Sequence, residues 1–166
     1  VTGLASTLAV GSNNRGVTVE GADARIVSTG DTVTVSGIGG TLAEGDANYG
    51  VNLEGDGARI TAGNATVTVN GTAGGQTNAT VGGADNTGVR VAGGTTTDAT
   101  ISSGNGGGTL SINGQGGKAD GDGNSDGVRM TDAVIRGTNG VTVQGFAFQG
   151  AAGVSGDSNQ GISMTN

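Results

Sequence analysis

The hexapeptide Asn14-Arg15-Gly16-Val17-Thr18-Val19 returns four more times, with substitutions, along this 166-residue chain. Every copy has a small polar residue two positions before a Gly, and apolar residues at alternate positions after it. The glycines lie 34, 38, 39 and 34 positions apart, at Gly16, Gly50, Gly88, Gly127 and Gly161. A self-similar period of this length is typical of stacked repeats. The chain is therefore predicted to form one domain over residues 1–166, with units at about 14–47, 48–85, 86–124 and 125–158 and partial units at 1–13 and 159–166.

Three kinds of short apolar segment recur in the same order along the units. The first follows the Gly of the hexapeptide, the second reads Ala-x-Ile, and the third reads Thr-Val-Thr-Val-x-Gly. All three alternate apolar and polar residues and are rich in β-branched side chains, which indicates half-buried β-strands. No window carries a helical stripe, so an all-β fold is expected. The first copies are Val17–Val19, Ala24–Ile26 and Thr32–Gly37.

Such strands could also build a sandwich, but there they need not be copies of the strands one period earlier. In a β-solenoid they must be, because each coil stacks on the last at about 4.8 Å. We therefore predict a parallel β-solenoid (β-helix) with three sheets, about four to five coils of 34–39 residues, and Gly/Asn-rich loops. Right-handed coiling is expected from the handedness of parallel crossovers. The predicted inward ladders are Ile26, Ile60, Ile101 and Ile135, beside Ala24, Ala58, Ala99 and Ala133.

The composition fits a narrow core. The chain has 38 Gly, no Pro, no Cys, no His and only three aromatic residues, Tyr49, Phe146 and Phe148. Large aromatic residues usually dominate a globular core, so Val, Ile, Leu and Ala must fill this one. The absence of Pro suits stacked strands, which use nearly every backbone N–H. High Gly content also occurs in disordered chains, but the regular apolar pattern argues against disorder.

Charge and residue chemistry narrow the function classes. The net charge is −7, the isoelectric point is near 4.2, and the seven basic residues are scattered singly. No basic footprint for nucleic acid exists, and the apolar runs are too short to span a membrane. Without His or Cys, the usual nucleophile–base pairs and zinc sites are nearly unavailable. We therefore expect that the protein is not an enzyme.

The small polar residue of the hexapeptide forms the most specific column. A buried Asn at a solenoid turn can bond the backbone of the next coil and tolerate a left-handed backbone. Equal Asn residues are therefore expected to stack as a structural ladder. Its members are Asn14, Asn48, Asn86 and Asn159, with Ser125 as the substitute in one unit.

The segment 120–127 resembles the opening of a calcium loop, where alternate oxygen ligands converge on a hard cation. The candidate ligands are Asp120, Asp122, Asn124 and Asp126. The twelfth position of the pattern holds Ala133 in place of Glu, and the flanks are predicted strands rather than helices. The alternative is an acidic turn. Calcium is the one cofactor for which the sequence offers a candidate site.

Two outward-facing patterns suggest further chemistries. Glu20 and Glu54 occupy equivalent positions in adjacent coils, as an acid/base pair on a polysaccharide-acting enzyme would, but aromatic sugar platforms are scarce. Thr-x-Thr ranks beginning at Thr32 and Thr66 could order ice-like water, although the ranks decay at Ser111. A solvated sheet face explains both patterns more simply. Phe146 and Phe148 offer either a partner contact or packing under a loop.

The two ends lack an obvious polar cap. Val1 aligns with Val35 inside a third-type strand, and Asn166 lies just past a first-type strand. Free solenoid ends need polar caps to avoid edge-to-edge association. We therefore predict that the ends stack, either on further copies in a fibre or on neighbouring coils of a longer chain.

The Gly-Val/Ile phrases, Ala-x-Ile strands and Thr-Val-Thr-Val-x-Gly strands resemble the β-helix repeats of filamentous-haemagglutinin-like and autotransporter surface proteins of bacteria. The likeness covers nearly the whole chain. It implies a secreted, elongated structural or adhesive shaft at the bacterial cell surface. A glycan- or calcium-binding β-helix module is the alternative function, followed by a polysaccharide-acting enzyme and an ice-binding protein.

Overall fold

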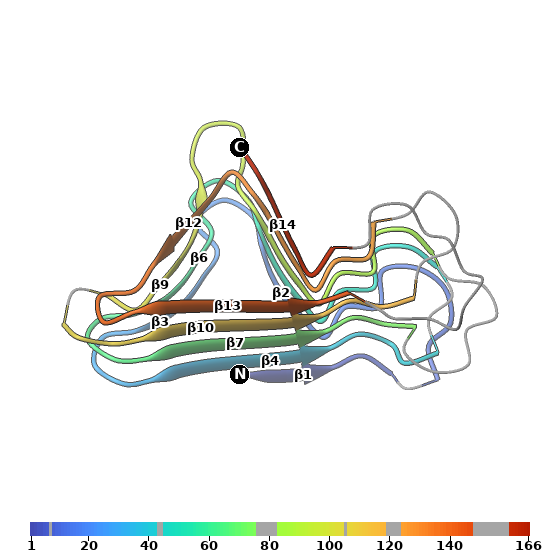
Figure 1. Ribbon diagram of the computed structural model, residues 1–166, viewed down its shortest axis with the longest axis horizontal. Helices are drawn as coiled ribbons and strands as arrows, with labels where there is room; N and C mark the ends of the chain where they lie inside the picture. The colour runs from blue at the N-terminus through green and yellow to red at the C-terminus, as the bar shows by residue number, and fades with distance from the viewer. Residues whose placement is uncertain (7, 43–44, 76–82, 105, 119–123, 148–159) are drawn as a thin grey trace.

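A computed structural model describes residues 1–6, 8–42, 45–75, 83–104, 106–118, 124–147 and 160–166. These residues contain fourteen β-strands and no helix. The strands form three parallel sheets that stack into a β-solenoid of about four turns. Figure 1 shows the coils superimposed as a triangle, with one sheet on each side. The predicted fold class is confirmed.

Each sheet collects one kind of sequence segment. The first sheet contains β2 (Val17–Glu20), β5 (Val51–Glu54), β8 (Val89–Ala92), β11 (Val128–Thr131) and β14 (Ile162–Thr165). The second contains β3 (Arg25–Ser28), β6 (Arg59–Ala62), β9 (Ala99–Ser102) and β12 (Ala133–Arg136). The third contains β1 (Thr2–Leu4), β4 (Val33–Ile38), β7 (Val67–Thr72), β10 (Leu110–Gln115) and β13 (Val141–Phe146).

The strand register follows the sequence repeat residue by residue. Ile60 pairs with Ile26 on one side and with Ile101 on the other. Ile101 in turn pairs with Ile135, and Ala99 pairs with Ala133. Inward side chains therefore lie over one another along the solenoid axis. In the central coils these side chains are fully buried, including Val51, Leu53, Val67, Val69, Val89, Val91 and Ile112.

Glycines form a close backbone contact between the third and first sheets. A Cβ added at Gly71 in β7 would lie 2.0 Å from the carbonyl oxygen of Gly88, which precedes β8. The same contact recurs one coil earlier, where a Cβ at Gly37 would lie 2.0 Å from the Gly50 oxygen. Real side chains cannot approach a backbone this closely. The contact explains why Gly recurs both at the end of the third segment and in the hexapeptide.

The third coil carries two insertions. The longer one, Gly93–Asp98, lies between β8 and β9. Asp56 of the preceding coil anchors it, because Oδ1 accepts the N–H groups of Thr96 at 2.9 Å and Thr97 at 3.0 Å. The shorter one lies between β9 and β10. There the Ser103 hydroxyl donates to the Gly108 carbonyl at 2.8 Å.

Candidate functional site

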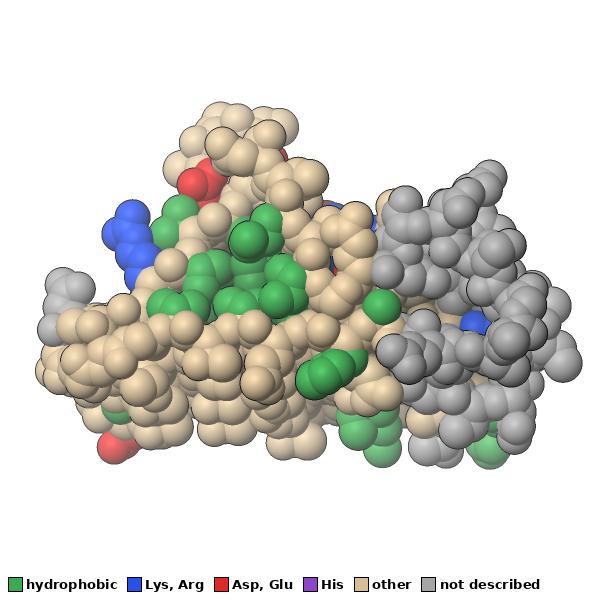
Figure 2. Space-filling view, viewed as in Figure 1, with side chains coloured by type: hydrophobic (Ala, Val, Ile, Leu, Met, Phe, Trp, Pro, Cys, Tyr) green, Lys and Arg blue, Asp and Glu red, His purple; other side chains and the backbone are tan. Residues whose placement is uncertain are grey.

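The C-terminal end of the described solenoid leaves inward side chains uncovered. Met164 in β14 is 73% exposed, whereas Val91, which lies two strands away in the same register, is fully buried. Val141 in β13 is 45% exposed, and Ile162 is 39% exposed. Figure 2 shows apolar side chains gathered in the middle of this end face. The core is therefore open at this end.

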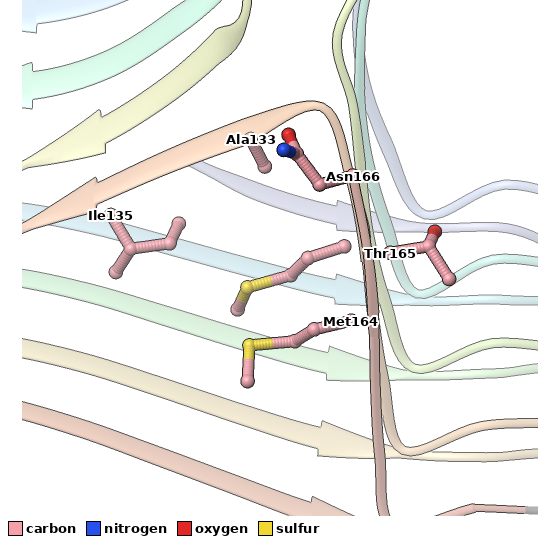
Figure 3. Close-up of a pocket in the computed structure, with 6 residues that line it drawn as sticks. Ala133, Ile135, Met164, Thr165 and Asn166 are labelled. Atoms are coloured by element: carbon pink, nitrogen blue, oxygen red, sulfur yellow. The ribbon is translucent and has the colours of Figure 1, made fainter.

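A hollow of about 420 Å³ lies on this end face beside β12 and β14. Figure 3 shows the side chains of Met164 and Ile135 in the space between the two strands. Ile135 and Ala133 are the last members of their ladders among the described residues. The hollow is lined by Met130, Ala133, Ile135, Met164, Thr165 and Asn166.

The N-terminal end is more closed. The inward residues of its first complete coil include Val17, Val19 and Val33, and each is only 7% exposed. Outside this coil, the apolar residues Val1, Leu4, Leu8 and Val10 are 60–78% exposed, and within it Ile26 is half-buried. Both ends were expected to be uncapped, but the larger opening of the core lies at the C-terminal end.

The repeated Asn forms a hydrogen-bonded ladder before the first sheet. The Asn14 backbone N–H donates to Oδ1 of Asn48 at 2.8 Å, and the Asn48 N–H donates to Oδ1 of Asn86 at 3.0 Å. The Asn86 N–H donates to the Ser125 hydroxyl at 3.2 Å, so Ser continues the ladder. The three Asn side-chain amides each donate to a carbonyl three residues earlier, on Gly11, Gly45 and Gly83.

The left-handed backbone conformation occurs one residue before the ladder position. The sequence pattern had predicted it at the Asn itself. Asn13, Ala47 and Asp85 have φ angles of 63°, 59° and 60°. Asn and Asp tolerate this conformation better than other non-Gly residues, whereas Ala47 has no such advantage. Asn159, the last predicted ladder residue, lies outside the described residues.

The two carboxylates of the hypothetical acid/base pair are each bound to an Arg. Glu20 and Glu54 pair in register on the outer face of the first sheet. Arg15 bonds Glu20 at 2.9 Å, and Arg90 bonds Glu54 at 2.6 Å. The hydrogen bond from Arg90 lowers the pKa of Glu54, against a smaller opposing effect of burial. A glycosidase acid needs a raised pKa, so this arrangement favours a structural role.

Tyr49 joins neighbouring coils on the same face. Its buried ring lies between the guanidinium groups of Arg15 and Arg90, at 5.3 and 5.4 Å from the ring centre. Burial raises the pKa of the Tyr49 hydroxyl, and the nearby Arg90 charge opposes that shift. Such cation–π contacts stabilise stacked coils. Sequence reasoning missed this cluster, although Arg15 and Tyr49 occupy the same position of the repeated hexapeptide.

The candidate calcium loop is only partly described. Asp120 and Asp122 lie outside the described residues, while Asn124 and Asp126 lie within them. Asp126 is buried, and its Oδ2 accepts a hydrogen bond from Nε of Arg129 at 2.7 Å. Arg129 also donates to the Asn124 carbonyl at 2.9 Å. Within the described ranges no group of three acidic side chains could hold a metal ion, and calcium binding at this loop stays a prediction.

The outer face of the third sheet carries hydroxyl and amide side chains. Its strands contain no charged residue, and Thr34, Thr68 and Ser111 follow one another in register. Phe146, 63% exposed, is the last residue of β13 and lies one position after the Gly that ends the repeated third segment. Phe148 lies outside the described residues. A hollow of about 230 Å³ on this face is lined by Asn70, Gly71, Thr72, Asn113, Gly114, Gln115 and Phe146.

No model of a protein family, no curated protein and no solved structure matches this chain. Across the part of the chain that the structure describes, no helix has the length and apolar character to cross a membrane. The geometry of the solenoid and its surfaces is therefore the basis on which a function can be proposed.

Proposed function

We propose that this chain is a structural segment of an extracellular bacterial shaft, either a fibre or an adhesin, in which the solenoid continues along its axis. Continuation occurs through the open end, where further β-coils cover the uncovered core. The function is mechanical, because backbone ladders and a dry aliphatic stack together resist unfolding. The assignment to the bacterial surface follows from the resemblance to filamentous-haemagglutinin-like and autotransporter repeats.

The observation that carries the proposal is the exposure of Met164, Val141 and Ile162 on the end face. Apolar surface of this kind is stabilised by burial at roughly 25 cal/mol per Å². The edge strands β12, β13 and β14 also leave one side of each strand without a partner strand among the described residues. An unpaired parallel edge over an exposed core is a template for additional strands.

Sedimentation velocity over a range of concentrations tests axial association of purified chains. We expect concentration-dependent oligomers and, in negative-stain images, particles elongated along one axis. Met164→Lys should abolish this association, because a charge would lie on the contact face. Thr34→Lys is the matched control, since Thr34 faces outward on the third sheet. Equal sedimentation of the wild type and the Met164→Lys variant at every concentration would contradict axial contact through this face.

The groove on the third sheet supports glycan binding as a second candidate function. Amide side chains of Asn70 and Asn113 lie beside the exposed ring of Phe146, and the lining contains no charged residue. Amides that bond hydroxyl groups, beside an aromatic ring that packs on a sugar face, suit a neutral carbohydrate. Phe146→Ala should remove binding in a screen of neutral oligosaccharides, while Thr34→Ala on the same face should not.

A further inference from the structure

The third sheet differs from the other two sheets in charge. Its described strands contain no charged residue, on a chain whose net charge is −7. Copies of an acidic chain repel one another, so an uncharged sheet is the side on which two copies approach at the lowest electrostatic cost. The strands of the other two sheets carry Glu20, Arg25, Glu54, Arg59, Arg90, Arg129 and Arg136.

The outer face of the third sheet is also broad and flat. β4, β7, β10 and β13 have six residues each and pair over their full length. In Figure 1 these strands run nearly parallel, with little of the twist that most sheets have. With about 4.8 Å between strands and about 3.3 Å per residue, the face has a footprint of roughly 450 Å².

The outward side chains of this face form three columns along the solenoid axis. Two columns contain only hydroxyl and amide side chains, and in one of them the Asn113 amide donates to Oδ1 of Asn70 at 2.9 Å. The remaining column consists of Leu4, Ile38, Thr72, Gln115 and Phe146. Its apolar members lie at opposite ends of the column, with Leu4 and Ile38 60% and 41% exposed at one end and Phe146 63% exposed at the other.

A second copy fits this pattern when it is turned over about an axis that runs along the strands. This rotation keeps each column opposite itself and reverses the order of the strands. Phe146 of each copy then packs on Leu4 and Ile38 of the other, and burial of these side chains stabilises the pair. The hydroxyl and amide groups between them both donate and accept hydrogen bonds, so they pair with their own kind.

The other two-fold arrangement fits less well. Rotation about an axis along the solenoid would exchange the two outer columns and keep the order of the strands. Phe146 would then lie opposite Thr142, and Ile38 opposite Thr34, so apolar side chains would meet hydroxyl groups. The distribution of apolar residues therefore favours the antiparallel pair.

We propose that the outer face of the third sheet binds a second copy of this chain side by side, with the two solenoid axes antiparallel. The inference goes beyond axial continuation, because it joins the sides of two solenoids and uses none of the exposed residues of the end face. The contact is isologous, so it closes at a dimer, whereas axial stacking builds longer oligomers. Its footprint is smaller than the roughly 800 Å² per partner of a standard interface, so the pair is weak.

The pair also covers the groove that contains Asn70 and Phe146. A glycan bound in this groove and a second copy on this face therefore exclude each other.

The test uses chains that carry Met164→Lys, in which the axial contact is removed. Thr72 lies in β7, the central strand of the sheet, so in the antiparallel pair it faces Thr72 of the second copy. At about 0.5 mM, a concentration suited to a weak interface, the parent should sediment as a dimer. Thr72→Lys and Thr72→Glu should each be monomeric when alone, because like charges meet across the pair.

An equimolar mixture of the Thr72→Lys and Thr72→Glu chains should form dimers again, because opposite charges then face each other. Thr72→Ser is the matched neutral control and should dimerise like the parent. A monomeric parent, or a mixture that stays monomeric, would overturn the proposal. Failure of the two contacts is distinguishable, since Met164→Lys affects only the axial contact and Thr34→Lys only the lateral one.

Cross-linking tests the antiparallel order of the strands, because the chain contains no Cys. Thr2 and Gln144 lie in one column, in the first and last strands of the sheet. With a short thiol cross-linker, Thr2→Cys and Gln144→Cys chains should link to each other and not to themselves, since equal positions lie about 19 Å apart. Linkage of Gln144→Cys chains to themselves alone would overturn the antiparallel arrangement.

Discussion

The central coils and the C-terminal coil use equivalent residues with different results. Val91 and Met164 share a register position, and so do Leu110 and Val141. The central members are 0% and 1% exposed, whereas the terminal members are 73% and 45% exposed. The difference lies in the coil above, which among the described residues covers only the central members. Burial in a solenoid is therefore a property of the neighbouring coils as much as of the residue.

The largest loss of stability is expected when a substitution breaks the glycine contact in the central coils. Gly71→Ala should destabilise the protein by about 3 kcal/mol or more, because its Cβ would meet the backbone of Gly88. Gly145→Ala should cost clearly less, since its neighbour Gly161 precedes the terminal strand β14 and can shift. Urea denaturation measures both. Gly30→Ala is the control, because nothing lies within 4 Å of a Cβ there, and an equal loss in all three would refute the contact.

Removing the same side chain from two levels of one ladder measures how much the coil above contributes to its burial. Ile101→Ala should cost about 3 kcal/mol, because Ile101 is fully buried. Ile135→Ala, one coil further, should cost about 1 kcal/mol, since solvent already reaches the end face. Chemical denaturation with matched m-values gives the difference. Similar losses at the two positions would mean that the end is covered.

The Asn ladder offers a polar version of the same test. Asn86→Ala removes the acceptor of the Asn48 N–H and the donor to the Gly83 carbonyl, both in a fully buried setting. We expect a loss of about 2 kcal/mol. Asn14→Ala, in the first complete coil, should lose about half as much. Calorimetric melting of the two variants distinguishes them, and a larger loss at Asn14 would contradict the ladder.

A stabilising change is expected at the strained corner of the second unit. Ala47 has a φ of 59°. The equivalent corners of the neighbouring units are occupied by Asn13 and Asp85, which tolerate this backbone conformation. Ala47→Asn should therefore stabilise the protein by about 0.5–1 kcal/mol. Ala22→Asn serves as the control on an exposed residue. A lower melting temperature for Ala47→Asn would show that the corner carries no strain.

The smallest expected change is the loss of folding stability at acid pH. Arg90 lowers the pKa of Glu54 in the folded state. The ion pair therefore contributes stability above the unfolded pKa, and this contribution is lost as pH falls through the folded pKa. Because the pair is partly exposed, less than about 1 kcal/mol is expected. Glu54→Gln should reduce the loss of stability between neutral and acid pH, and an unchanged pH profile would exclude the pair as a contributor.

The sequence predicted what repeats and missed what depends on contacts between unlike positions. Ile26, Ile60 and Ile101 could be aligned in advance, because one period fixes both strand and register. The Arg129–Asp85 bond, at 2.5 Å, joins residues from different positions of the repeat, so the period carries no signal for it. The packing of Gly71 against Gly88 also joins different positions of the repeat. It could not be predicted, because glycines recur at turns as well as at close backbone contacts.

Hydrogen–deuterium exchange of the monomeric wild-type chain measures whether the C-terminal end of the core is open. A stack of three parallel sheets with an open C-terminal end predicts the slowest amide exchange in β5, β7, β8 and β10. It predicts intermediate exchange in β11 and the fastest exchange among the core strands in β12, β13 and β14. Protection of β14 equal to that of β8 in the monomer would contradict the open end on which the proposed axial continuation depends.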